Sequence, residues 1–226
     1  RLDYMIGAGS LQSFLQIYLF EQRFVYSQRI NLDANETEHL MTLINENLKP
    51  ENINYRYDFF YDDCSTRIRD LLEKSIGEKL LYPPFESGET ATFRDMVGKY
   101  QNPYPWLKFG VDLIMGSYSD INASSRDRMF LPIDLKNELS ETVINRNSKM
   151  IPLLQDPEFI LDFDPLVIRQ KFFISPVFVF TLLLIIVIIF SALFKSKKIN
   201  NLTDIFIYSV FSILALLMIF FNFFTD

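Results

Sequence analysis

Hydrophobic residues recur at helical spacing in several parts of the chain before residue 150. Those between Leu11 and Leu19 predict a helix over residues 10–22, with Ser10 as its N-cap. Asp33 and Glu36 are spaced as in a capping box and predict a second helix, which Pro50 ends. The same periodicity predicts further helices over residues 68–77, 106–115 and 135–144.

Two stretches alternate apolar or aromatic residues with mostly polar ones, which is typical of strands. One contains Phe24, Tyr26 and Ile30, and the other runs from Tyr55 to Tyr61. A proline-containing loop is expected over residues 82–87. Strands and helices do not alternate regularly enough for a doubly wound parallel sheet, so the predicted fold class is α+β without repeats.

The C-terminal part carries two long runs without a charged residue, 172–194 and 205–224. A helix over the first run would be about 35 Å long, enough to cross a hydrocarbon core of about 30 Å. The two runs therefore predict a transmembrane helical hairpin. Its connecting loop, residues 195–204, carries three lysines and is expected to be cytoplasmic, because basic loops stay on that side.

This topology divides the chain into three expected parts. An extracytoplasmic domain would cover residues 1–150, a linker 151–171 and the membrane region 172–226. Residues 1–171 would lie on the periplasmic side of the cytoplasmic (inner) membrane. Because the chain begins with Arg1 and shows no signal peptide, we expect a cut or processed N-terminus, and more chain after Asp226.

Composition excludes several classes of function. Lys and Arg number 22 against 28 Asp and Glu, and this net charge of −6 argues against a nucleic-acid-binding protein. One Cys cannot form an internal disulfide, and one Cys with one His cannot supply the four ligands of a structural zinc site. No glycine-rich phosphate loop or zinc-protease motif is present, so we expect neither cofactor nor metal.

Cys64 is the strongest candidate for chemistry, because it lies where the aromatic segment gives way to a helix. Unpaired N–H groups and the macrodipole at a helix N-terminus favour the nucleophilic thiolate, and the same N–H groups can stabilise an oxyanion. Ser65 and Arg67 are supporting candidates, as are Asp62 and Asp63, which oppose thiolate formation unless they cap the helix or orient another group. The alternative is a small buried cysteine without reactivity.

Acyl transfer by a cysteine also needs a base, usually His. The only histidine is His39, which lies on a polar helix and is expected to be a solvated surface residue. Asp112 is a candidate for orienting a catalytic His, although an ordinary carboxylate on a helix surface is the simpler interpretation.

The region from Pro50 to Asp70 resembles the outer-domain signature of the Lnb-type lipoprotein N-acyltransferases. The resemblance rests on the aromatic and acidic run from Asp58 to Asp62, on Cys64, and on the run that begins at Thr66. Further matching segments occur in the expected order, with membrane helices after them, at residues 2–5, 109–113 and 129–132.

The resemblance implies a papain-like or NlpC-like domain in which a cysteine at a helix start works with a histidine. Cys64 would take an acyl chain from a membrane phospholipid as a thioester and pass it to the α-amino group of a bacterial diacylglyceryl-cysteine lipoprotein. The family's catalytic His lies in a Phe-Gly-His segment upstream of the match at Leu2, so it is expected outside this chain. The family usually has Asn at the position of Asp63.

Two other functions fit the same residues. One is a membrane-anchored cysteine peptidase or amidase that cleaves cell-wall peptides. The other is a non-catalytic, membrane-anchored binding protein in which Cys64 belongs to the core. The predicted membrane hairpin and the absence of a cell-wall-binding module favour the acyltransferase.

Overall fold

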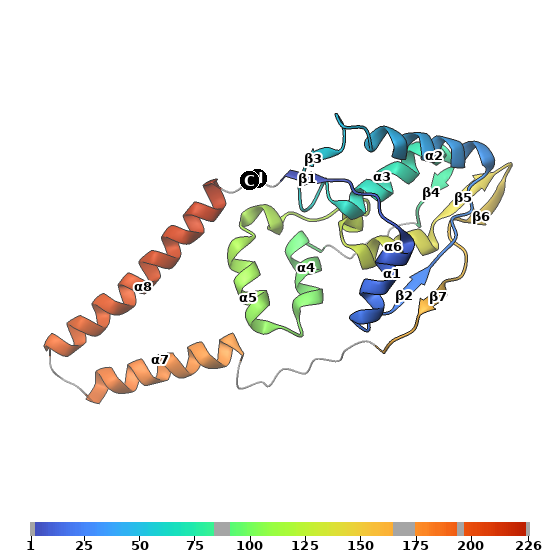
Figure 1. Ribbon diagram of the computed structural model, residues 1–226. Coiled ribbons are helices and arrows are strands. Elements are labelled where there is room, and N and C mark those ends of the chain that lie inside the picture. Colours follow the sequence, from blue (N-terminus) through green and yellow to red (C-terminus); the bar gives the residue numbers. More distant parts are fainter. Residues whose placement is uncertain (1–2, 84–90, 165–174, 194–196, 225–226) are drawn as a thin grey trace. The chain divides into compact units, whose positions relative to one another are not determined.

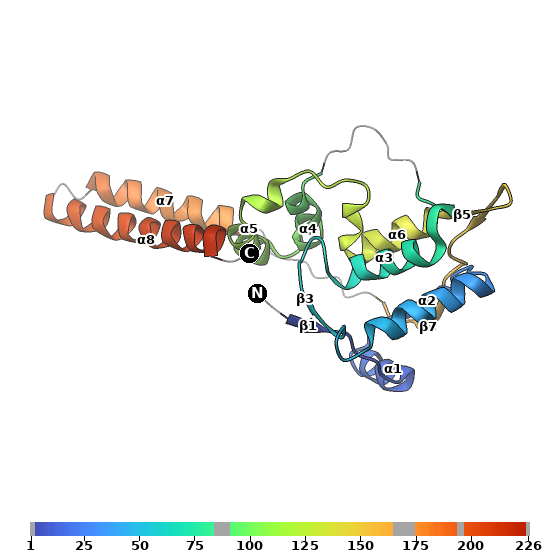
Figure 2. The same cartoon turned by 90° about the horizontal axis from the view of Figure 1, so that it is seen from above.

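The computed structural model describes residues 3–83, 91–164, 175–193 and 197–224 (Figures 1 and 2). The chain forms two compact units. The first comprises Arg1–Thr90 and Ala123–Val167, and the second comprises Ala91–Asn122 and Ile168–Asp226. Residues 91–122 therefore belong with the C-terminal helices, although they lie within the range expected for the extracytoplasmic domain.

Short antiparallel strands form three small sheets in the first unit. They are β1 (Asp3–Met5) with β3 (Asn54–Arg56), β2 (Val25–Ser27) with β7 (Glu158–Leu161), and β4 (Leu80–Leu81), β5 (Val143–Arg146) and β6 (Lys149–Pro152) in that order. Asn147 and Ser148, both with positive φ, form the two-residue turn between β5 and β6. β7 lies within residues 151–171, the range expected as a linker, so the folded part of the first unit extends into that range.

Local capping signals fix three of the helices of this unit. α1 (Leu11–Phe20) begins at Ser10, whose side chain accepts a hydrogen bond from the Ser13 N–H at 3.1 Å. α2 (Ala34–Asn47) begins with the predicted capping box of Asp33 and Glu36. α3 (Cys64–Ile76) ends at Gly77, whose φ of 71° suits glycine. The predicted positions of these three helices are confirmed.

The core of the first unit forms where α3 meets the later part of the chain. The other elements here are the short 3₁₀ helices η1 (Gly77–Lys79) and η3 (Asp127–Phe130), and the helix α6 (Pro132–Glu141). Seven buried side chains pack together: Leu72, Ile76, Met129, Leu135, Leu139, Ile144 and Leu153. α3 is thus held along its length by segments that lie far from it in the sequence.

Two predicted elements of the first unit differ from the structure. The strand predicted from Tyr55 to Tyr61 ends at Arg56, because the Asp58 carboxylate accepts from the Phe60 and Tyr61 N–H groups and turns the chain. The helix predicted over residues 135–144 begins at Pro132 and ends at Glu141. Val143 and Ile144 pair instead with β4 and β6. The predicted loop 82–87 falls largely outside the described residues.

The second unit is helical. It contains α4 (Phe93–Gln101), α5 (Pro105–Ile114), the 3₁₀ helix η2 (Ser117–Asp120), α7 (Pro176–Leu193) and α8 (Lys197–Phe224). Two candidate membrane spans, Pro176–Leu193 and Asn200–Phe220, are long and apolar enough to cross a bilayer, and almost none of their residues are buried. The α+β class and the pair of apolar C-terminal helices are confirmed. The expected loop 195–204 is wrong in extent, because α8 already begins at Lys197.

Candidate functional site around Cys64

A tight turn over residues 58–62 directly precedes the start of α3, where the candidate nucleophile Cys64 lies. The backbone N–H groups of Asp58 and Asp62 each donate to the other residue's carbonyl, at 3.1 and 3.0 Å. The turn places Phe60 in an edge-to-face contact with Phe130, with 5.5 Å between ring centroids. Phe60 therefore anchors the turn in the protein interior, directly before the helix start.

Asp63 is the N-cap of α3. Its carboxylate accepts the Thr66 N–H at 2.8 Å, and the Thr66 hydroxyl accepts the Asp63 N–H at the same distance. Burial raises the pKa of Asp63 against the hydrogen bonds from Thr66 and Ser65, which lower it. Of the two roles considered for this acidic residue, capping is therefore the one that its contacts support.

Cys64 is the first residue of α3, and its side chain is exposed. A role as a buried core cysteine is therefore wrong. The Ser65 and Thr66 N–H groups already interact with the Asp63 carboxylate, whereas the Cys64 N–H belongs to the first turn, where no intrahelical acceptor is in reach. The Cys64 N–H is thus better placed than the Ser65 N–H to meet an oxyanion. The Ser65 side chain itself is buried.

Tyr55 and Tyr57, which sequence analysis did not assign to the site, are near enough to interact with the charge of Cys64, and Tyr4 packs against Tyr57. Tyr4 on β1 pairs in register with Tyr55 on β3, and its ring stacks on that of Tyr57 with 4.3 Å between centroids. Burial raises the pKa of Tyr57 to about 12, with smaller contributions from the charges of Asp63 and Cys64. Tyr57 is therefore neutral at physiological pH, and it is near enough to Cys64 to interact with its charge.

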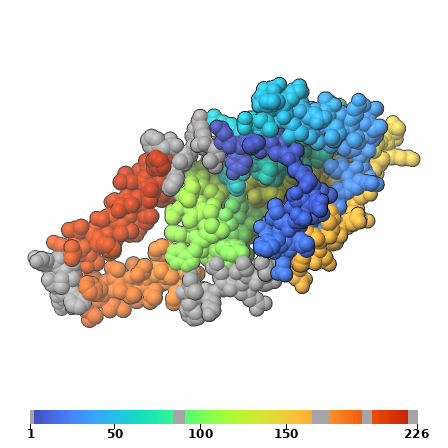
Figure 3. All heavy atoms as spheres, in the orientation of Figure 1, coloured from blue at the N-terminus to red at the C-terminus, as the bar shows by residue number. Residues whose placement is uncertain are grey.

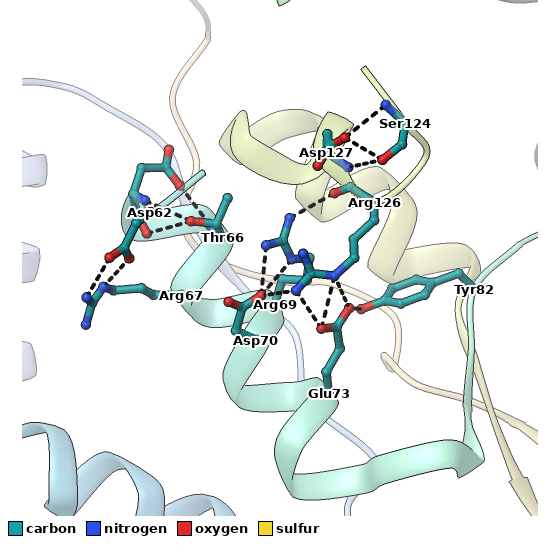
Figure 4. Close-up of polar contacts among 11 residues, drawn as sticks. Asp62, Thr66, Arg67, Arg69, Asp70, Glu73, Tyr82, Ser124, Arg126 and Asp127 are labelled. Carbon is teal, nitrogen blue, oxygen red and sulfur yellow. Dashed lines mark hydrogen bonds and ion pairs between the residues drawn. The ribbon is translucent and has the colours of Figure 1, made fainter. Parts of the chain in front are cut away.

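Arg67 does not present a free positive charge to the thiol. Its guanidinium donates to both carboxylate oxygens of Asp62, at 2.7 and 2.9 Å, and its central carbon lies 3.5 Å from the centre of the Tyr55 ring. Asp62 is thus the ion-pair partner of Arg67. Figure 4 shows this pair beside the α3 cap, at the end of the helix that carries Cys64.

Arg69, on the same helix, is buried and points away from the cap (Figure 4). It donates to the Asp70 carboxylate at 2.9 Å and to the Arg126 carbonyl oxygen at 2.9 Å. The Arg126 side chain in turn binds Asp70 and Glu73, and Glu73 accepts the Tyr82 hydroxyl. This network holds α3 in place and was not foreseen, because its members lie far apart in the sequence.

The remaining predicted site residues lie elsewhere. Asp112 belongs to α5 of the second unit, where its carboxylate binds Lys108 at 3.2 Å and Arg94 at 3.5 Å. His39 is an exposed residue of α2, as expected for a solvated histidine. Within the described ranges, no three His, Cys, Asp or Glu side chains are grouped in a way that could hold a metal ion.

The geometry around Cys64 suits nucleophilic chemistry. An exposed thiol and a first-turn N–H occupy one capped helix start, and the side chain of Tyr57 is near enough to interact with the charge of Cys64. Such a site can attack a carbonyl carbon and accommodate the negative oxygen that forms.

Comparison with known proteins identifies this part of the chain. Residues 1–100 match the family described as the Lnb N-terminal periplasmic domain. No curated protein and no solved structure gives a significant match to the chain. The matched range includes Cys64, its capping residues and the tyrosines beside it. Residues 1–100 are therefore similar to an Lnb-type periplasmic domain, and this match supports the Lnb-type assignment of this part of the chain.

Proposed function

We propose that this protein is a membrane-bound lipoprotein N-acyltransferase with Cys64 as its nucleophile. The observation that carries the proposal is the exposed Cys64 at the capped start of α3, within a domain of the Lnb type. The two candidate membrane spans support it, because both the acyl donor and the acceptor of such a reaction reside in a bilayer.

The first half-reaction would load the enzyme. The Cys64 thiolate attacks an ester carbonyl of a phospholipid, and the Cys64 N–H stabilises the resulting oxyanion. The C–O ester bond then breaks, the departing lysophospholipid oxygen takes a proton, and the acyl chain remains on Cys64 as a thioester.

The second half-reaction would deliver the acyl chain. The α-amino group of a diacylglyceryl-cysteine lipoprotein attacks the thioester carbonyl, an amide forms, and the Cys64 sulfur leaves as the thiolate. The proton that the amine loses goes to a general base, which we assign to a histidine supplied from outside these 226 residues.

Acyl-enzyme trapping tests the proposal. The full-length protein is incubated with phospholipid vesicles and analysed by intact mass spectrometry, beside the variants Cys64→Ala and His39→Ala. We expect a hydroxylamine-labile adduct of fatty-acyl mass on the wild type and on His39→Ala, and none on Cys64→Ala. An adduct that persists in Cys64→Ala would overturn the assignment of the nucleophile.

The same experiment separates the alternatives. A Cys64 that reacts with alkylating reagents but forms no acyl adduct would favour a peptidase or amidase, and cell-wall peptide would be the next substrate to test. A Cys64 that is unreactive in both assays would favour a binding protein.

A further inference from the structure

α5 has three different faces, and the first is polar. Lys108 and Asp112 lie one turn apart and form an ion pair at 3.2 Å. Arg94 of α4 donates to the Asp112 carbonyl oxygen at 2.6 Å and to the Asp120 carboxylate at 2.6 Å. The charged groups of α5 are therefore satisfied on the side that faces α4 and η2.

The second face of α5 is aromatic and contacts a candidate membrane span. The Trp106 and Phe109 rings lie 6.0 and 5.4 Å from that of Phe180, between centroids. Phe180 follows Pro176, the first residue of α7, by about one helical turn, which is a depth of roughly 6 Å at 1.5 Å per residue. α5 also contacts α8, and in Figure 1 it lies near the Pro176 end of α7 and the Phe224 end of α8.

The third face of α5 is aliphatic and open. Leu107 is 55% exposed and Ile114 is 53% exposed. They are seven positions apart, which places them on one side of the helix two turns from each other. The same segment appears in green as part of the open surface in Figure 3.

We propose that α5 is an interfacial membrane helix whose Leu107 and Ile114 enter the lipid at the Pro176 end of the hairpin. Interfacial helices bury an apolar face by about 5–10 Å at the boundary between headgroups and acyl chains. The contact with the first turns of α7 sets α5 at this depth, and tryptophan is enriched at this level of membrane proteins. The occupant of the aliphatic face is lipid, since the helix that α5 contacts is itself uncharged and exposed along most of its length.

The inference does not depend on the chemistry of Cys64, and its test needs no activity. The full chain, with Cys64→Ser to remove the only thiol, is reconstituted in phosphatidylethanolamine–phosphatidylglycerol vesicles. A nitroxide is then attached at Leu107→Cys or Ile114→Cys and its collisions with oxygen and with a water-soluble nickel chelate are measured. Labels at Leu183→Cys on α7 and at exposed Glu38→Cys on α2 serve as the lipid and water references.

We expect the labels at Leu107 and Ile114 to collide more with oxygen than with nickel, as at Leu183 but at a shallower depth. Labels that behave as at Glu38 would overturn the proposal, and so would labels that neither reagent reaches, since protein would then cover this face. Trp106 is the chain's only tryptophan, so quenching of its fluorescence by phospholipids brominated near the headgroup provides a check in the protein without substitutions. Absence of quenching would equally count against an interfacial α5.

Discussion

Arg67 lies over Tyr55, with its guanidinium carbon 3.5 Å from the centre of the ring. The same guanidinium forms two hydrogen bonds with Asp62, so a strand, a turn and the first turn of α3 are joined through one side chain. A planar, five-donor group is needed for this arrangement, and lysine cannot reproduce both interactions.

Arg67→Lys is therefore expected to loosen the start of α3 without removing a charge. We expect a loss of about 1 kcal/mol in the free energy of unfolding, in line with a partly exposed cation–π contact and ion pair. The rate of Cys64 alkylation is expected to change as well, because the residue shares this helix start. Thermal unfolding and thiol-labelling kinetics of the full chain in detergent would measure the two effects.

Arg23→Lys is the matched control. Arg23 also lies over a tyrosine, Tyr18, and pairs with a carboxylate, Glu21, but at the end of α1. Its substitution should leave Cys64 labelling unchanged. Equal changes in labelling for both variants would contradict a specific role of Arg67 at the site.

Asp63→Asn is expected to stabilise the protein at neutral pH. Burial raises the pKa of Asp63, so the folded state holds the proton more tightly than the unfolded state does. This contribution to stability is present at low pH and is lost as the pH rises through the raised pKa. Asn keeps the cap without the charge, so its melting temperature should exceed that of the wild type at pH 7, and the difference should vanish below about pH 4.

Asp95→Asn is the control, because the pKa of Asp95 is shifted in the opposite direction to that of Asp63. Asp95 belongs to the capping box of α4, and its hydrogen bonds with Thr92 lower its pKa. Its contribution to stability is present at neutral pH and lost as the pH falls, so Asp95→Asn should lower the melting temperature at pH 7. Melting curves that shift in the same direction for both variants would refute the assignment for Asp63.

Tyr57→Phe is expected to change how the stability of the protein depends on pH in alkaline solution. With the pKa of Tyr57 raised from 10.0 to about 12, the folded chain keeps a proton that the unfolded chain releases between these values. Stability should therefore fall as the pH rises through this window, and it should fall less steeply in Tyr57→Phe. Absorbance titration of tyrosinate should also lose part of its late phase in the variant. A curve superimposable on that of the wild type would contradict the burial of Tyr57.

Arg69→Met is expected to cost about 2 kcal/mol of unfolding free energy, because its charge-assisted hydrogen bonds to Asp70 and to the Arg126 carbonyl are lost. Arg126→Met removes ion pairs with Asp70 and Glu73 that are half exposed, so its cost should be about 1 kcal/mol or less. Chemical unfolding of both variants measures the order. A larger loss of unfolding free energy for Arg126→Met than for Arg69→Met would contradict this order and show that Arg126 contributes more to the network.

Sequence patterns predicted those parts of the fold that depend on near neighbours. The caps at Ser10, Asp33 and Gly77 work within a few residues, so their signals are complete in the sequence. β5 and β6 were missed, because Val143 and Ile144 also fit the preceding helical periodicity and only pairing with β4 decides between strand and helix.

In the candidate site, too, features set by near neighbours could be predicted and features set by distant residues could not. Cys64 and its helix start could be predicted from the aromatic-to-helical change of pattern. The place of Tyr57 beside Cys64 depends on the pairing of β1 with β3, and the anchoring of Arg69 depends on Arg126, 57 positions away. Pairings at such separations leave no local signal in a single sequence.

The Arg126 contact also has a mechanical consequence. The chain leaves the first unit before Ala91 and re-enters it at Ala123. Shortly afterwards, Arg126 contacts α3 twice: its carbonyl oxygen accepts a hydrogen bond from Arg69, and its side chain pairs with Asp70. Tension along this return segment would thus be applied to the body of the helix whose first residue is Cys64. A displacement of the residues just before Arg126 would therefore act on α3 directly, through these contacts.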